Sequence, residues 1–190
     1  MSLSQLEKSL VNIEGHLLIQ DSDTGEVLVK RRNAIHFENM SVAIANLLAN
    51  SAGANGTHNV LSMSYGNGGT LIDGTGAVTY KAPNTGSSTS GLYNETFTKD
   101  IDSALVNHTN GTVYSDVVMT STLDYNIPAG QDAEDTTTDM NGDYVFDEIA
   151  VYSANNDMLT HVIFHPVQKS ANRKISVVYT LRIRTTYSDV

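Results

Sequence analysis

The segment Tyr65-Gly66-Asn67-Gly68-Gly69-Thr70 is the stretch whose composition most suggests chemistry, because glycine-rich turns can present backbone amides to a phosphate. A P-loop, however, needs a lysine directly after its second glycine, and none occurs here before Lys81. A dinucleotide fingerprint needs a third glycine that opens a helix, whereas Gly74 precedes a strand-like stretch. We therefore expect a bend after a strand, at which glycine tolerates positive φ or the close approach of another backbone.

The acidic stretch TTDMNGDYVFDE offers oxygen ligands for a hard cation. It resembles the later half of an EF-hand loop, but Thr137 stands at the first-ligand position, and the residues after Asp143 alternate like a strand. The weak candidates for a Ca²⁺ or Mg²⁺ site are Asp139, Asn141 and Asp143, with Asp132, Glu134 and Asp135 nearby. We favour an exposed acidic loop with an Asn-Gly turn, and we expect no cofactor.

The histidines and paired carboxylates predict no catalytic site. His161 and His165 are four residues apart in a strand-like stretch, which separates them by about 13 Å, too far to share one metal. His36 is isolated before a helical pattern, and no G-x-S-x-G nucleophile motif occurs. Asp147 and Glu148 are adjacent on a predicted strand, so we expect them to point to opposite faces and not to form a glycosidase pair by themselves.

The composition excludes several classes of function. The chain has 190 residues, a net charge of −10 and no cysteine, which argues against nucleic acid as the main partner and excludes disulfides and thiol chemistry. No apolar run reaches the ~20 residues that span a bilayer, and the first residues lack the pattern of a signal peptide. We expect a protein made in the cytoplasm that has no membrane partner.

The periodicity predicts a mainly β protein in one domain. Residues 1–10 are expected to form an arm or short helix, and residues 11–190 a two-sheet antiparallel β sandwich, with a jelly-roll-like arrangement as one form of it. The clearest hairpin has strands at 15–20 and 27–30, and one helix, near residues 38–51, packs on a sheet, with Asn39 or Ser41 as its cap. Further strands are predicted at 58–66, 77–83, 92–101, 112–126, 143–153, 158–170 and 174–188, and residues 84–110 are otherwise polar and rich in turns.

The charges are unevenly distributed along the chain. Basic residues gather at 30–32 and in the last fifth of the sequence, whereas acidic residues gather from Asp132 to Glu148. Such a chain could pair its own surfaces head to tail. One hypothesis is that the basic C-terminal strand is a sheet edge that meets the acidic loop of a neighbour, with Arg173, Lys174, Asp132 and Asp135 as interface candidates.

Five segments together resemble a family of structural proteins of tailed bacteriophages, including contractile-tailed marine phages. They are KRRNAIHFENMSVAIANLLAN, MSYGNGGT, VTYKAPN, DYVFDEIAVYS and LTHVIFHPVQKSANRKISVVYTLRI, and the resemblance covers roughly residues 10–187. It implies a non-enzymatic virion protein, present in many copies and synthesised in the host cytoplasm, whose partners are itself and other virion proteins.

The expected function is therefore a homo-oligomeric component of the phage neck, collar or tail. One alternative is a capsid (head) decoration protein. Another is a carbohydrate- or receptor-binding module at a tail tip, for which Tyr65, Tyr80, Tyr93 and Tyr125 would supply aromatic side chains near loops. A third alternative is a metal-assisted hydrolase built on the acidic loop.

Overall fold

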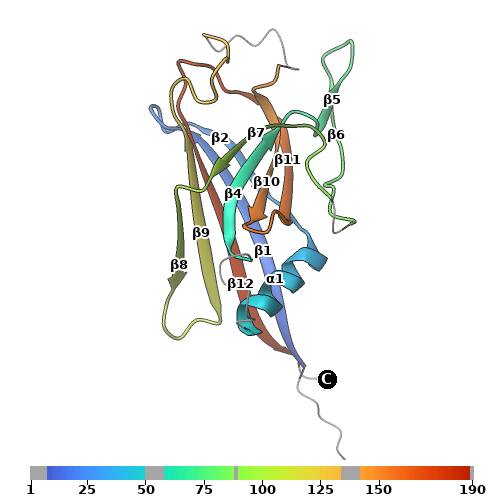
Figure 1. Cartoon of the computed structure of the whole chain (residues 1–190), viewed down its shortest axis with the longest axis vertical. Helices are drawn as coiled ribbons and strands as arrows, with labels where there is room; N and C mark the ends of the chain where they lie inside the picture. The colour runs from blue at the N-terminus through green and yellow to red at the C-terminus, as the bar shows by residue number, and fades with distance from the viewer. Residues whose placement is uncertain (1–7, 50–57, 88–89, 134–141, 189–190) are drawn as a thin grey trace, which may run out of the picture.

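Two five-stranded antiparallel sheets pack face to face in the computed structural model, which describes residues 8–49, 58–87, 90–133 and 142–188. The strands are β1 (Lys8–Asp21), β2 (Val27–Arg32), β3 (Ala34–Ile35), β4 (Val60–Gly66), β5 (Thr70–Ile72), β6 (Val78–Tyr80), β7 (Glu95–Asp100), β8 (Ser103–His108), β9 (Tyr114–Leu123), β10 (Val145–Ser153), β11 (Met158–Gln168) and β12 (Ile175–Ser188), and the helix is α1 (Phe37–Ala49). The first sheet has the order β2-β1-β12-β9-β8 and the second β3-β11-β10-β4-β7 (Figure 1). The predicted β sandwich is confirmed. The two sheets together contain ten described strands, two more than the eight of a jelly roll.

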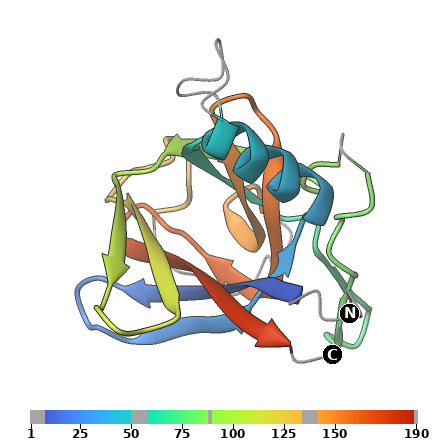
Figure 2. The same ribbon diagram turned by 90° about the horizontal axis from the view of Figure 1, so that it is seen from below.

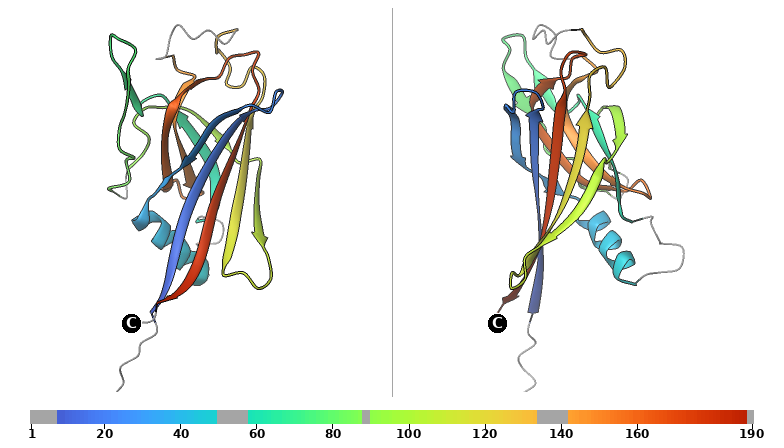
Figure 3. Two further views of the ribbon diagram at one scale, coloured as in Figure 1. Left: turned by 180° about the vertical axis from the view of Figure 1, so that it is seen from behind. Right: turned by 90° about the vertical axis from the view of Figure 1, so that its left-hand side faces the viewer.

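The longest strands, β1 and β12, pair without a break from Lys8↔Ser188 to Asp21↔Ile175. Alternate residues such as Leu17, Ile19 and Val177 are buried against the second sheet, as the two-residue period of a strand requires. Residues 8–10, which were expected in an arm, belong to β1. Both strands extend past the lower ends of β10 and β11 (Figure 3).

The core between the sheets contains a pair of packed aromatic side chains. Tyr65 and Phe146 are both buried, and their ring centroids lie 5.1 Å apart. The Tyr65 hydroxyl donates a hydrogen bond of 2.9 Å to Ser121 Oγ, so it joins β4 in the second sheet to β9 in the first. Burial raises the pKa of Tyr65 well above its ordinary value.

The helix α1 begins one residue before the predicted range, and His36 caps it. Asn39 N–H donates to His36 Nδ1 (3.2 Å) and Met40 N–H to the His36 carbonyl (2.9 Å). The predicted caps, Asn39 and Ser41, are therefore wrong, and Asn39 is instead buried with its amide donating to the Met158 carbonyl. The helix lies on the side of the second sheet, across the lower end of the sandwich from β1 (Figure 2).

Three short strands lie outside the predicted set, namely β3, β5 and β8. The strand β8 falls within residues 84–110, for which loops were expected, and most of its side chains are exposed. The strand forms because its backbone pairs with β9 from Ser103↔Thr120 to His108↔Ser115. Tertiary pairing therefore outweighs the weak local pattern.

We expect Gly15→Ala to destabilise the protein by about 2 kcal/mol, because it forces a methyl group into a packed position. A Cβ at Gly15 would lie 1.7 Å from Asn33 Oδ1 and 2.6 Å from the Tyr179 hydroxyl, whereas a Cβ at Gly74 would meet nothing within 4 Å. Denaturant unfolding of Gly15→Ala, with Gly74→Ala as the matched control, measures the difference. Equal stability of the two variants would contradict this packing.

Candidate functional site

An irregularity in β10 brings Asp147 and Glu148 to the same loop. The pairing of β10 with β11 shifts register between Phe146 and Glu148, and Phe146 and Ile149 both pack in the core with two residues between them. This bulge breaks the two-residue alternation. The expectation that the adjacent carboxylates point to opposite faces is therefore wrong, since both accept hydrogen bonds from residues 68–70.

Glu148 is fully buried, and its carboxylate accepts four hydrogen bonds. Oε1 accepts from Gly68 N–H (3.1 Å) and Asn94 N–H (2.8 Å). Oε2 accepts from Tyr93 N–H (3.0 Å) and from His161 Nε2 (3.0 Å). Burial acts to raise the pKa of Glu148, but the bonds from His161, Asn94 and Tyr93 outweigh it and hold that pKa below its ordinary value.

The hydrogen bonds of His161 fix its tautomer. The Asn84 backbone N–H donates to Nδ1 at 2.8 Å, and because an amide can only donate, Nδ1 carries no proton. The ring is therefore neutral, and its Nε2–H donates to the Glu148 carboxylate. Both ring nitrogens and both carboxylate oxygens are occupied by partners within the chain.

Asp147 is bound by the other half of the same loop. Its Oδ1 accepts from Gly69 N–H (2.8 Å), and its Oδ2 accepts from Thr70 N–H (2.7 Å) and Thr70 Oγ1 (2.5 Å). Burial raises the pKa of Asp147, and the nearby charge of Glu148 adds to this effect, against the hydrogen bonds from Thr70 and Gly69.

The glycine-rich loop thus does bind anions, but the anions are the chain's own carboxylates. The predicted close approach of another backbone is confirmed, because a Cβ at Gly66 would lie 2.4 Å from the Asn94 carbonyl oxygen and one at Gly68 2.7 Å from Asn94 N. Any side chain at these positions would displace the segment that carries Tyr93 and Asn94.

The arrangement connects three segments and buries the Glu148–His161 pair. Glu148 and His161 have 0% exposed side chains, and the one hydroxyl bonded to the pair of carboxylates, Thr70 Oγ1, is itself donating to Asp147. A general base needs a free lone pair that faces a substrate. This pair has none.

The residues that the structure describes contain no cluster of the predicted metal ligands. Asp143 is exposed, whereas Asp139, Asn141 and Asp135 lie outside the described residues. Within the ranges that the structure describes, no three His, Asp or Glu side chains are close enough to hold a metal ion. His165 is exposed and accepts or donates one bond with the Tyr80 hydroxyl (3.3 Å), away from His161.

The hypothesis of a basic C-terminal edge is wrong, because β12 lies between β1 and β9. Arg173 Nε is 3.1 Å from Asp21 Oδ2, and Lys174 Nζ is 3.4 Å from Asp124 Oδ2. Both interface candidates therefore form ion pairs within the chain. Asp132 is exposed, and its carbonyl accepts from Ala171 N–H.

Three of the four tyrosines proposed as sugar platforms are partly exposed, and the fourth, Tyr65, is in the core. The Tyr93 hydroxyl donates to the Ala82 carbonyl (2.8 Å), and the Tyr125 hydroxyl donates to Asp23 (2.8 Å). The Tyr93 and Tyr125 rings therefore lie on separate loops that their own hydroxyls anchor, whereas Tyr80 ends β6.

Sequence reasoning missed one buried charge, Lys169. Its ammonium donates to Gln131 Oε1 (3.0 Å) and to the Ser170 carbonyl (2.9 Å), and it lines a hollow of about 210 Å³ together with Asp132 and Tyr144. Burial lowers the pKa of Lys169 to about 8. No local signal marks this lysine, since its neighbours come from residues 130–132 and 142–145.

Compared with known proteins, the chain matches no protein-family model, no curated protein and no solved structure. No helix in the described ranges combines the length and apolar character that crossing a bilayer requires.

We expect Glu148→Gln to destabilise the protein by about 3 kcal/mol, because an amide cannot accept from all four donors. The folded-state pKa of Glu148 is below its ordinary 4.5, so its contribution is complete above pH 4.5 and is lost as the pH falls below that value. Denaturant unfolding at several pH values should show that the difference in unfolding free energy between the native protein and the variant becomes smaller in acid. Asp143→Asn, at an exposed position, is the control, and a deficit that does not depend on pH would contradict an ionised Glu148.

We expect Lys169→Met to remove a rise in stability between pH 8 and 10.5. The folded-state pKa of about 8 lies below the ordinary 10.5, so unfolding takes up a proton in this interval and stability increases with pH. The difference in unfolding free energy between variant and native protein should therefore change across this interval. The exposed Lys30→Met is the control, and parallel pH curves for the native and Lys169→Met proteins would contradict the buried charge.

Proposed function

We propose that the protein is a non-enzymatic structural component of a tailed-phage virion that assembles in many copies at the neck, collar or tail. The resemblance of its segments to structural proteins of tailed phages supports this class of function. The buried Glu148–His161 pair supports a scaffold rather than a catalyst, because its acid–base groups form hydrogen bonds within the chain.

The observation that carries the proposal is an apolar surface left open at the lower end of the sandwich. A groove of about 440 Å³ lies between α1 and β1, lined mainly by apolar side chains. Phe37 is 79% exposed and Leu48 83% exposed on the helix, and Val11 is 60% exposed on the strand. Isolated soluble chains rarely leave contiguous apolar surface of this kind uncovered, whereas subunits of assemblies do.

The shape of the molecule also favours assembly. The strands β1 and β12 run 14 residues each and extend beyond the second sheet (Figures 1 and 3). Their extended ends bring the apolar residues Val11 and Ile13 to the same end of the molecule as α1. A neighbouring subunit that packs there would cover helix and strand together.

Light scattering of the purified protein over a series of concentrations and salt concentrations tests the proposal. We expect a discrete ring of about six or twelve copies, because a neck or tail component takes the rotational symmetry of the tube that it surrounds. A compact trimer would favour head decoration or a tail tip instead. A monomer under every condition would contradict the proposed homo-oligomer.

The double variant Phe37→Ser with Leu48→Ser links this test to the observed surface. We expect it to reduce the assembled fraction with little change in unfolding, because both side chains are exposed in the single chain. Leu71→Ser is the matched control, since Leu71 is 60% exposed but lies on the separate β5–β6 hairpin.

A further inference from the structure

We infer that copies of this chain contact one another head to tail through two opposite edges of the sandwich. The basic edge is β2 with Lys30, Arg31 and Arg32, and the acidic edge is the turn from β7 to β8 with Asp100 and Asp102. This inference rests on the proposed homo-oligomeric function and adds a pair of charged contact surfaces to the apolar surface of α1 and β1.

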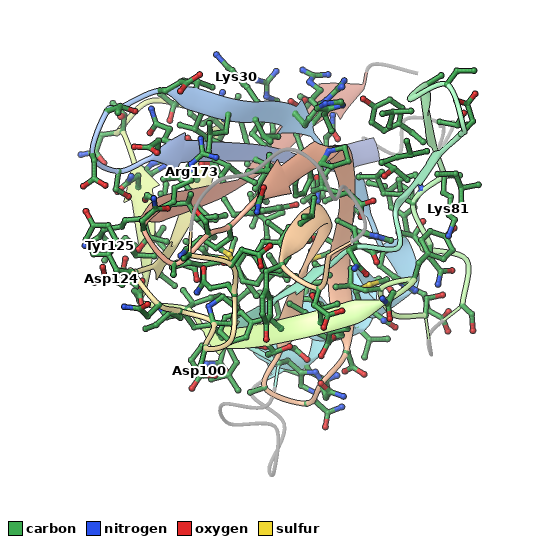
Figure 4. The ribbon with its side chains drawn as sticks, turned by 90° about the horizontal axis from the view of Figure 1, so that it is seen from above. Lys30, Lys81, Asp100, Asp124, Tyr125 and Arg173 are labelled. Atoms are coloured by element: carbon green, nitrogen blue, oxygen red, sulfur yellow. The ribbon has the colours of Figure 1, made fainter. Side chains whose placement is uncertain are left out.

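The two edges lie on opposite sides of the molecule. The strands β2 and β8 are the outermost strands of the first sheet, and β7 is the outermost strand of the second sheet. Viewed from above, Lys30 and Asp100 project from opposite sides of the sandwich (Figure 4). Edge strands carry backbone groups that a further strand can pair with, so both edges are natural contact surfaces.

The strand register places the two charged edges at the same height. Lys30 lies opposite Leu18, Leu18 opposite Val178, Val178 opposite Thr120, and Thr120 opposite Ser103. Asp102 directly precedes Ser103, and its N–H donates to the Thr120 carbonyl. A neighbour related by rotation about an axis parallel to the strands would therefore bring its Asp100–Ser103 turn level with Lys30.

The cations on the basic edge are exposed, and one of the three forms an ion pair within the described ranges. Arg32 lies 3.6 Å from Glu14, with 78% of its side chain exposed. Lys30 and Arg31 are exposed and form no ion pair with any described residue. The chain has a net charge of −10, so an edge with three adjacent cations is opposite in charge to most of the molecular surface.

The acidic edge combines a free carboxylate with apolar side chains. Asp100 is exposed and forms no ion pair within the described ranges, whereas Asp102 pairs with Lys99 and also accepts from Thr122 N–H. On β8, Leu105 is 61% and Val106 is 71% exposed. Apolar contact here would add to the attraction between the edges.

A hollow beside the basic edge gives an acidic side chain room to enter. It measures about 280 Å³ and lies between β2 and the segment after β6, with Arg31, Arg32, Tyr80 and Lys81 among its lining residues. Lys81 Nζ already donates to the Gly68 carbonyl and lies 4.4 Å from the Tyr93 ring centroid. Arg31 Cζ lies 5.9 Å from the Tyr80 ring centroid, and this contact holds the guanidinium beside the hollow, where it can bind a carboxylate of the neighbour.

The strand directions favour a repeating contact. Each neighbouring pair in the first sheet is antiparallel, so β2 and β8, four places apart, run in the same direction. Equal orientation and equal height allow the acidic edge of each copy to meet the basic edge of the next. A heterologous contact of this kind closes into a ring when its rotation divides a full turn.

A charge exchange between two variants of the full chain tests the inference by light scattering in low salt. The first variant is Lys30→Glu with Arg31→Glu, and the second is Asp100→Lys, with Asp102 kept because it holds Thr122 N–H. Each variant alone juxtaposes like charges, and we expect it to weaken assembly by roughly tenfold or more. The equimolar mixture juxtaposes opposite charges at every contact and should regain the assembly of the native protein.

The control is Asp143→Lys, which reverses one exposed charge elsewhere and should leave assembly unchanged. Unfolding curves confirm that each variant is folded. If the native protein assembles but neither variant is impaired, or if the mixture stays impaired, the inference is overturned and the proposed function stands. A native protein that is monomeric throughout overturns both.

Discussion

The burial of the Glu148 carboxylate is the constraint on which the second sheet and its loops depend. A carboxylate without exposed surface is stable only when strong donors surround it, and here they come from the loop after β4, the segment before β7 and His161 on β11. One ionised group therefore fixes the positions of three segments far apart in sequence. The same requirement explains why Gly66 and Gly68 carry no side chain, because the backbone of residues 93–94 lies against them.

An acid–base pair in a protein interior usually directs attention to catalysis, but the hydrogen bonds of this pair give it a different role. His161 accepts from Asn84 N–H through Nδ1 and donates through Nε2, so it has no nitrogen left for a substrate. The capacity for interaction lies instead on the outside, at the apolar surface of α1 and at the charged sheet edges. A buried pair that is fully hydrogen-bonded and an exposed apolar surface are consistent with the proposed role as an assembly subunit.

Much of the fold follows from sequence pattern, while the site does not. The β1–β2 hairpin, the helix and the long strands were predictable from two-residue and 3.6-residue periodicity. The irregularity at Asp147 was not, because it depends on the partner strand: Asp147 faces three residues of β11, including Pro166, which has no N–H for the ladder. The position of β12 within the sheet depends on its partners β1 and β9, and no pattern within the strand reports them. The sequence does not predict His36 as the helix cap, because histidine is not among the preferred capping residues.

Nitrogen-15 NMR of the His161 ring at neutral pH tests most directly whether the buried Glu148–His161 pair has a structural role rather than a catalytic one. The structure requires an unprotonated Nδ1 and a protonated Nε2, with an Nε2 proton that exchanges with water far more slowly than that of the exposed His165. A protonated Nδ1, or an Nε2 proton that exchanges as fast as that of His165, would show that the site opens to solvent and would contradict this account.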